Sequence, residues 1–180
     1  IQRLQRLASQ NEQDSRHYAI ASKIPMLEPS DSEEAKDFVK KAYGLSEAYD
    51  TPVLLRMCTR IAHSQCAVEI EERKELPVRE YRKDPVKYVM APANAIRKHP
   101  VVEKKMADLS EFAENCEFNR VELSEENRKV GIITSGTCYE YVKEVFRDSV
   151  SVLKLHMQLI TVRERLFSEI LINDGKVSFP

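Results

Sequence analysis

The stretch SDSEEAKDFVKKAYGLSEAYDTPVLLRM, residues 30–57, decides the fold class. Its first part predicts an amphipathic helix of about four turns, because apolar residues recur every three or four positions. A capping box opens the helix, either Ser30 with Glu33 or Asp31 with Glu34, and acids fill the first turn, where the helix dipole favours them. The apolar stripe consists of Ala35, Phe38, Val39, Ala42, Leu45 and Tyr49.

A strand is predicted on each side of this helix. Residues 50–52 break the helical pattern, and the apolar run VLLRM that follows has the length of a strand buried on both faces. Upstream, KIPMLEPS at residues 23–30 supplies a strand that Pro25 and Pro29 keep short and push toward a sheet edge or a strand end. Residues 24–58 therefore form a β-α-β unit, whose crossover implies a parallel sheet.

A second unit follows the same pattern in RKVGIITSGTCYEYVKEVFRDSVSVLKL, residues 128–155. Residues 130–134 form an apolar strand, residues 135–137 turn and cap, and residues 150–155 form the next strand. The helical stripe between the strands consists of Tyr139, Val142 and Val145. The predicted fold class is therefore α/β, with parallel-sheet β-α-β units in two lobes.

The segment between the units is rich in charge. Residues 69–98 contain prolines at 77, 85 and 92 that prevent a continuous helix, so we expect an extended connector with room for a short edge strand. Pro100 is expected to open a helix at its first position. The apolar side of that helix would carry Val102, Met106, Leu109 and Phe112 or Ala113.

Composition excludes several classes of function. With 28 basic and 29 acidic residues the formal net charge is −1, which gives no footprint for nucleic acid or an anionic membrane. No run of about 18 apolar residues occurs, and the opening IQRLQRLA lacks the apolar core of a signal peptide. We therefore expect a cytoplasmic protein with no membrane partner.

Cysteine and glycine usage removes further motifs. The four cysteines, Cys58, Cys66, Cys116 and Cys138, match neither a CxxC zinc site nor an iron–sulfur run, and we expect reduced, mostly buried thiols. The chain has four glycines and no GxGxxG, GxxxxGK[ST] or GxSxG. These residues alone therefore carry no nucleotide-binding or hydrolase signature.

One candidate site follows the buried strand, in TRIAHSQ at residues 59–65. Ligands of open α/β sheets collect at the carboxyl ends of strands, so Arg60 and His63, with Thr59 and Ser64, could bind a carboxylate or phosphate. The alternative is a surface loop whose arginine pairs with a local acid.

A second candidate is TSGT, residues 134–137, where backbone amides at a helix start could hold an anion. The alternative is a plain capped turn between strand and helix. Tyr139 and Tyr141 are expected to pack their helix rather than to bind substrate. The crowded glutamates Glu71, Glu72 and Glu75 are not expected to act as acid–base groups. Such groups need burial to shift their pKa values, and the sequence predicts no burial for these three.

Several blocks in consistent order resemble one family. They are SQNEQDSRHYA, residues 23–56 as quoted above, TRIAHSQ, YVMAPANAIRKHPVVEKKM, NRVE and KVGIITSGTCYEYVKEVF. Together they are similar, from about Ser9 to Leu155, to the alpha subunit of indolepyruvate:ferredoxin oxidoreductase. The resemblance implies a thiamine-diphosphate enzyme that decarboxylates aryl 2-oxo acids, passes electrons through 4Fe-4S clusters to ferredoxin and releases an arylacetyl-CoA.

The resemblance also implies domains. Residues 1–68 would end a domain that holds the cofactor's pyrimidine ring, residues 69–128 would form a charged crossover and connecting helix, and residues 129–180 would begin a transketolase C-terminal-like domain. In the family the activating glutamate lies upstream of this region, and the Mg²⁺-binding GDG motif and the cluster cysteines lie downstream. We therefore expect an internal fragment that is inactive alone and binds none of these cofactors by itself.

The polar stretch SQNEQDSRHY, residues 9–18, gains a role from this resemblance. Gln10, Asn11 and Gln13 would offer amides beside the thiamine pocket, and Asp14 and Arg16 would hold the loop to its own lobe. The expected partners are the beta subunit, ferredoxin and coenzyme A, with no nucleic acid. A second hypothesis is a non-catalytic α/β module that only docks other subunits.

Overall fold

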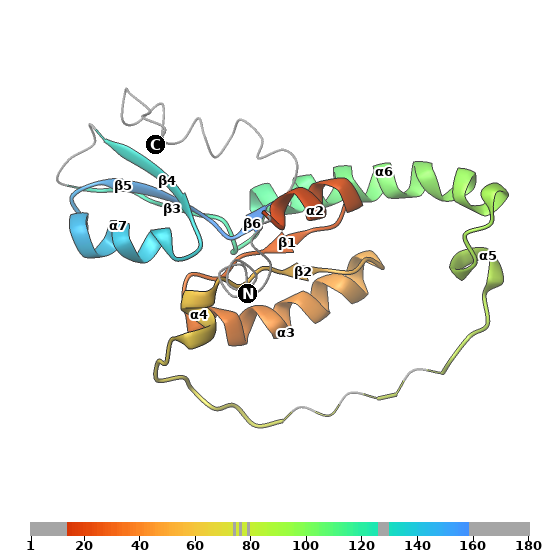
Figure 1. The fold of residues 1–180 in the computed structure, drawn as a ribbon, viewed down its shortest axis with the longest axis horizontal. Helices are drawn as coiled ribbons and strands as arrows, with labels where there is room; N and C mark the ends of the chain where they lie inside the picture. Colours follow the sequence, from red (N-terminus) through yellow and green to blue (C-terminus); the bar gives the residue numbers. More distant parts are fainter. Residues whose placement is uncertain (1–13, 74, 76, 79, 126–129, 159–180) are drawn as a thin grey trace, which may run out of the picture.

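A computed structural model describes residues 14–158 apart from 74, 76, 79 and 126–129 (Figure 1). The helices are α2 (Arg16–Ser22), α3 (Ser32–Tyr49), α4 (Thr59–His63), α5 (Pro85–Tyr88), α6 (Pro92–Asn115) and α7 (Cys138–Phe146). The strands are β1 (Met26–Leu27), β2 (Leu54–Leu55), β3 (Arg120–Glu122), β4 (Gly131–Ser135), β5 (Ser151–Leu155) and β6 (Met157–Gln158).

The first sheet has the strand order β2-β1-β6. β1 and β2 are parallel and connected through α3, so the first β-α-β unit is confirmed. Of the two expectations for this strand, a sheet edge was wrong, because β1 lies in the centre with β6 antiparallel on its other side, whereas the prolines do lie at the strand's ends. Pro25 and Pro29 fall just outside the two strand residues, where neither proline removes a bond of the ladder. The expected burial of β2 on both faces was also wrong, since Leu54 and Leu55 are only half-buried.

Capping residues mark both ends of helix α3. The Asp31 carboxylate accepts a hydrogen bond from the backbone N–H of Glu34 at 2.8 Å, so Asp31 caps the helix. Asp50 takes the left-handed conformation, with φ 48°, and its N–H donates to the Ser46 carbonyl. Phe38 and Leu45 are buried on the face that packs on the sheet.

The second sheet has the order β3-β5-β4. β4 and β5 are parallel and connected through α7, which confirms the second β-α-β unit. β3, from the segment before this unit, pairs antiparallel with β5.

The two sheets share one continuous stretch of chain, because β5 ends at Leu155 and β6 begins at Met157. The bend between them is held by Asn119, whose Oδ1 accepts from the N–H groups of His156 and Met157 at 2.9 and 3.0 Å. Its Nδ2 donates to the Met157 carbonyl at 3.2 Å. The bend therefore leaves these backbone groups bonded.

The main hydrophobic core joins α3 and α6 to the first sheet. Its buried members are Leu27, Phe38, Leu45, Leu109, Ala113, Phe118 and Met157. The Phe38 and Phe118 rings pack edge to face, 5.5 Å apart. A smaller core of Tyr139, Val150 and Val152 holds α7 on the second sheet.

The expected start of the long helix was wrong. α6 begins at Pro92, and Pro100 lies inside it. Pro100 removes one hydrogen bond to the carbonyl of Ile96, a residue exposed enough for water to replace the bond. Four of the seven residues between Pro92 and Pro100 are good helix formers, namely Ala93, Ala95, Arg97 and Lys98, and Pro92 suits the first helical position. The helix therefore starts eight residues earlier than expected.

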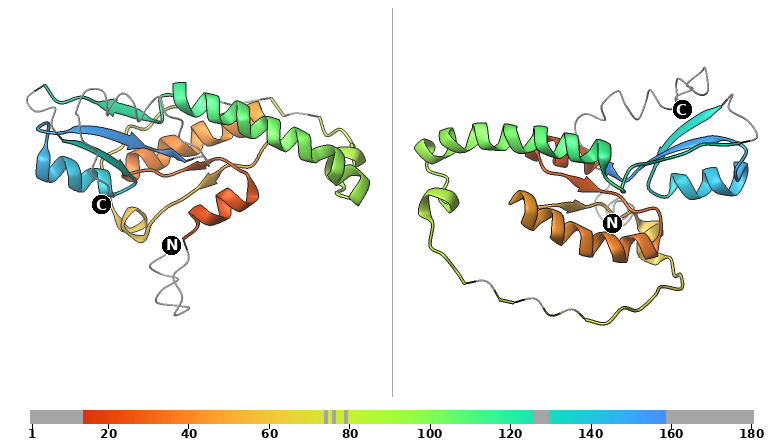
Figure 2. Two further views of the ribbon diagram at one scale, coloured as in Figure 1. Left: turned by 90° about the horizontal axis from the view of Figure 1, so that it is seen from above. Right: turned by 180° about the vertical axis from the view of Figure 1, so that it is seen from behind.

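The strap, residues 65–83, connects α4 with α5. Its described residues have no helix or strand, and they arc away from the body below α3 (Figures 1 and 2). Among the described residues, no helix is long and apolar enough to cross a membrane.

Candidate functional site

The carboxyl ends of strands from both sheets meet at Glu28. This residue follows β1, while Arg56 follows β2 and Gly136 follows β4. The Glu28 N–H donates to the carbonyl of His156 at 2.8 Å, and His156 Nδ1 lies 2.9 Å from the Glu28 carbonyl. This is the edge at which open α/β sheets bind ligands.

Two arginines hold the Glu28 carboxylate. Arg16 Nη2 lies 3.1 Å from Oε1 and Arg16 Nε lies 3.3 Å from Oε2, while Arg56 Nη1 contacts Oε1. The side chains of Glu28 and Arg56 are nearly enclosed, at 6% and 10% exposure. A buried carboxylate of this kind needs such partners, because an unpaired buried charge is costly.

Asp14, in the middle of the polar stretch at residues 9–18, completes the cluster. Arg16 Nη1 lies 3.3 Å from its Oδ2, and Arg56 Nε lies 3.9 Å from its Oδ1. Burial opposes ionisation of Asp14, but the backbone N–H of Arg16 and the charges of both arginines outweigh it and lower the pKa of Asp14. Burial acts against the Arg16 charge too, yet Glu28 raises the pKa of Arg16.

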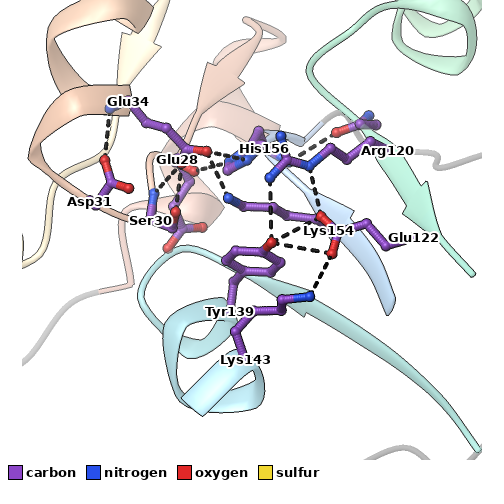
Figure 3. Close-up of polar contacts among 11 residues, drawn as sticks. Glu28, Ser30, Asp31, Glu34, Arg120, Glu122, Tyr139, Lys143, Lys154 and His156 are labelled. Carbon is purple, nitrogen blue, oxygen red and sulfur yellow. Dashed lines mark hydrogen bonds and ion pairs between the residues drawn. The ribbon is translucent and has the colours of Figure 1, made fainter. Parts of the chain in front are cut away.

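A second cluster links the two sheets directly (Figure 3). Glu34 of α3 accepts from Lys154 Nζ of β5 at 2.7 Å and from the Ser30 hydroxyl at 2.6 Å, and His156 Nε2 lies 3.2 Å from the same carboxylate. Burial opposes ionisation of Glu34, but these partners outweigh it and hold its pKa well below the usual 4.5. We call Glu28, Ser30, Glu34, Lys154 and His156 the junction.

Lys154 is enclosed although it is charged. Its Nζ lies 3.6 Å from the centroid of the Tyr139 ring, a cation–π contact in addition to the Glu34 pair. Burial lowers the pKa of Lys154, and Glu34 acts against that shift. Lys154 therefore joins α3, α7 and β5 through one ammonium group.

The network continues from Tyr139 to Glu122 of β3 (Figure 3). The Tyr139 hydroxyl donates to Glu122 Oε1 at 2.9 Å, and Lys143 Nζ lies 3.3 Å from Oε2. Burial raises the pKa of Tyr139, and the Glu122 carboxylate adds to that rise. The hydroxyl therefore stays protonated as a donor to Glu122.

A pocket of about 270 Å³ opens beside the junction, between α3, α4 and α7. Its lining residues are Ser30, Asp31, Arg60, Ile61, Ser64, Thr137, Glu140, Tyr141 and Glu144. It holds one arginine, Arg60, together with three carboxylates, those of Asp31, Glu140 and Glu144, and several hydroxyl groups.

The structure places Arg60 and His63, the two residues predicted to bind an anion, in different surroundings. Arg60 lines the pocket, and its guanidinium lies 4.9 Å from the centroid of the Tyr141 ring. His63 ends α4 on the surface and does not line this pocket. Asp14 lies in the Glu28 cluster, but Gln10, Asn11 and Gln13 lie outside the described residues, as does the end of the predicted C-terminal domain after residue 158.

Several sequence interpretations change. Gly136 has φ +55°, and a Cβ there would lie 2.8 Å from Glu28 Oε1, so the chain's own carboxylate fills the space beside the TSGT turn. Tyr139 packs as expected, but Tyr141 is exposed. The expected burial of most thiols was wrong: all four cysteines are free, two half-buried and two exposed.

Sequence reasoning missed the junction. Glu28, Glu34 and Lys154 were assigned only to helix or strand patterns. One signal was available, because Lys154 stands in the apolar run SVLKL, and a lysine in a buried strand needs an acidic partner. Its partner lies 120 residues away, so the sequence alone could not identify it.

The described residues do not fit the metal groups that the family resemblance implies. Within the described parts of the chain, no group of three or more His, Cys, Asp or Glu side chains could hold a metal ion. We therefore assign no Mg²⁺ or iron–sulfur ligand to them.

Comparison with known proteins supports one family. No protein-family model matches the chain. The chain is 42% identical over 153 residues to the indolepyruvate oxidoreductase subunit IorA of Methanothermobacter marburgensis, and 40% identical over 158 residues to that of Thermococcus kodakarensis. It is 37% identical over 153 residues to that of Archaeoglobus fulgidus. Each match covers 82% of this chain, which spans about a quarter of the length of these relatives. The family resemblance is thus confirmed: over most of its length, the chain fits an internal segment of the indolepyruvate oxidoreductase subunit IorA.

Proposed function

We propose that the chain is part of the catalytic subunit of an enzyme that oxidatively decarboxylates aryl 2-oxo acids of the indolepyruvate type. The acceptor would be ferredoxin and the product an arylacetyl-CoA. The observation that carries this proposal is the identity of 37–42% with IorA subunits over 82% of the chain. The alternative of a docking module without catalysis is not favoured by similarity to an oxidoreductase subunit.

The contribution of this segment would be to fix two lobes against each other. In the proposed division, residues 1–68 end the pyrimidine-binding domain, residues 69–128 cross over, and residues 129–180 begin the transketolase C-terminal-like domain. Glu34 forms an ion pair with Lys154 of β5, and the Glu28 carbonyl lies 2.9 Å from Nδ1 of His156, which follows β5. Ion pairs enclosed in this way favour one arrangement of the two units, because breaking one leaves a buried charge.

The cofactors would be held largely by other residues. Thiamine diphosphate supplies the carbanion chemistry when it is bound. Within this chain we assign Gln10, Asn11 and Gln13 to the loop beside its pyrimidine ring, and Asp14 to the anchor of that loop. The Asp14 contacts with Arg16 and Arg56 support the anchoring role. Arg60 is assigned to the carboxylate of a ligand in the adjacent pocket, and His63 to the rim of the same edge.

The proposed partners are a beta subunit, ferredoxin and coenzyme A, and the proposed location is the cytoplasm. The test uses the full-length protein expressed with its beta subunit. We expect ferredoxin reduction that requires indolepyruvate, coenzyme A and thiamine diphosphate with Mg²⁺. A full-length protein that binds no thiamine diphosphate in calorimetric titration would refute the proposal.

The role of the polar loop has its own test. Replacing Gln13 with alanine should weaken thiamine diphosphate binding, whereas replacing the exposed Gln65 of the strap with alanine should not. Unchanged affinity and activity in both Gln13→Ala and Asp14→Ala enzymes would remove this loop from the site while leaving the family assignment intact.

A further inference from the structure

A pocket lined by both kinds of charge lies between the two β-α-β units. Its volume is about 270 Å³, and its walls come from the start of α3, from α4 and from α7 (Figure 1). The residues that α7 and its N-cap contribute are Thr137, Glu140, Tyr141 and Glu144. They are three or four positions apart, so one face of the helix lines the pocket over about two turns.

Arg60 of α4 supplies the positive charge of the pocket. Its guanidinium lies 4.9 Å from the centroid of the Tyr141 ring, and this cation–π contact holds the arginine next to α7. Among the residues that the structure describes, no carboxylate forms an ion pair with Arg60. A guanidinium carries five N–H donors in a planar fork that matches a carboxylate. Within the described part of the chain, these donors remain available to a ligand.

Glu140 and Glu144 supply negative charge on the α7 wall. They lie about one helical turn apart, and both side chains are exposed. Neither forms an ion pair with a described residue, although the charge of Glu140 also acts on the Lys154 ammonium. The third carboxylate of the pocket, that of Asp31, accepts the N–H of Glu34 at 2.8 Å as the cap of α3. Opposite charges therefore line one pocket without pairing with each other.

We infer that this pocket binds a zwitterionic α-amino acid, with the ligand's carboxylate on Arg60 and its ammonium on Glu140 and Glu144. The carboxylate site at Arg60 rests on the proposed function, and the ammonium site is new. A carboxylate pairs with a guanidinium through two parallel hydrogen bonds, and an ammonium has three donors for neighbouring carboxylates. The two charges of one small ligand thus meet the two kinds of charge in the pocket.

Ligands with a single charge fit this pocket less well. A carboxylate without an ammonium would meet one arginine and three carboxylates, so repulsion would outweigh attraction. An amine without a carboxylate would add a second positive charge beside Arg60, whose donors would stay without an acceptor. A zwitterion brings no net charge and provides a partner for each group.

The apolar part of the lining favours an aromatic side chain on the amino acid. Ile61 is buried, at 4% exposure, and the Tyr141 ring is 42% exposed. Aromatic side chains pack favourably on other rings and on aliphatic groups. A volume of about 270 Å³ lies just below the range of pockets for drug-sized molecules, which suits one amino acid rather than a peptide.

The first test varies the ligand. L-Tryptophan should bind to the full-length protein with its beta subunit in calorimetric titration without thiamine diphosphate. Indole-3-propionate lacks the ammonium and tryptamine lacks the carboxylate. Each should bind about tenfold more weakly than tryptophan, because each loses one set of charge-assisted hydrogen bonds. Added salt should weaken tryptophan binding, since Arg60, Glu140 and Glu144 are exposed to solvent.

The second test varies the pocket. Arg60→Gln should weaken tryptophan binding about tenfold and remove the preference for tryptophan over tryptamine. Glu140→Gln combined with Glu144→Gln should weaken it about as much and remove the preference over indole-3-propionate. A loss of stability alone would not change these preferences.

Matched controls use exposed residues outside the pocket. Arg97→Gln, and Glu33→Gln combined with Glu111→Gln, should leave tryptophan binding unchanged. No binding of tryptophan, binding of indole-3-propionate or tryptamine as tight as that of tryptophan, or equal binding by pocket and control variants would overturn the inference. Titration of the same samples with thiamine diphosphate tests the proposed function separately, because a protein that binds thiamine diphosphate but not tryptophan lacks only the amino-acid site.

Discussion

The junction and the strap contain ion pairs of almost equal length in opposite surroundings. Lys154 Nζ lies 2.7 Å from Glu34 Oε1, with side-chain exposures of 2% and 20%. Lys40 Nζ lies 2.9 Å from Glu71 Oε2, with exposures of 51% and 57%. Water screens the exposed Lys40–Glu71 pair but is largely absent around the Lys154–Glu34 pair. Nearly equal distances therefore correspond to unequal interaction energies.

This difference separates two roles of charge in one chain. Buried charges in the junction are costly to separate, so they fix how the two sheets meet. Exposed charges in the strap contribute little to folding, so they are available for recognition of another surface.

The largest effect is expected at Glu34. Glu34→Gln keeps the size of the side chain but leaves the Lys154 ammonium without its charged partner, so the local free energy of unfolding should fall by about 3 kcal/mol. The measurement is hydrogen exchange of the β5 amides in the full-length protein. Glu33→Gln, one residue away and exposed, should change it by less than about 0.5 kcal/mol. Equal effects of both substitutions would contradict a special role for the pair.

The same carboxylate predicts a pH dependence. The pKa of Glu34 is lower in the folded chain than the ordinary 4.5, so its contribution is complete above pH 4.5 and is lost as the pH falls toward the folded value. Protection of the β5 amides should therefore decline with acid below about pH 4.5. The Glu34→Gln protein should show a shallower decline over the same range, and parallel curves would exclude Glu34 as the source.

A medium effect is expected at Gly136. An alanine there would take an unfavourable φ of +55° and place its Cβ 2.8 Å from Glu28 Oε1, so Gly136→Ala should destabilise the chain by about 1–3 kcal/mol. Gly44 in α3 has no atom within 4 Å of a built Cβ, and Gly44→Ala should stabilise by about 0.5–1 kcal/mol. Thermal unfolding midpoints of the two variants should move in opposite directions.

A smaller effect is expected at Tyr139. Tyr139→Phe removes a donor to Glu122 and should cost about 1 kcal/mol, because the carboxylate is only partly buried and can bind water instead. Tyr141→Phe, on the exposed side of the same helix, should cost less than about 0.5 kcal/mol. Urea unfolding of both variants measures the difference.

The parts of the fold that sequence predicted are local ones. Each β-α-β unit follows from a capped helix between two short apolar runs, and helix α3 shows this clearly, because Asp31 and Asp50 mark both its ends. Pro100 shows the limit of such rules. A proline can begin a helix or lie inside one, and here Pro92 begins α6 while Pro100 lies inside it, after seven residues that include the good helix formers Ala93, Ala95, Arg97 and Lys98.

The junction could not be predicted because it depends on contacts between distant residues. Glu34 and Lys154 are 120 positions apart, and β3 joins the second sheet from outside its β-α-β unit. Family resemblance drew attention to the loop before α2, and Asp14 does join the Glu28 cluster. Sequence periodicity predicts which face of a helix or strand is apolar, but not which other helix or strand that face packs against.

The smallest effect is expected for the exposed ion pair between Lys40 of α3 and Glu71 of the strap. A double-mutant cycle on Lys40→Ala and Glu71→Ala should give a coupling energy below about 0.5 kcal/mol that vanishes at high salt. The matching cycle on Lys154→Met and Glu34→Gln should give several times that value and little salt dependence, because the ions of the medium do not reach between enclosed groups. Equal couplings in the two cycles would mean that the strap is packed by something that buries Glu71 in solution, which would place the strap among the structural parts of the molecule.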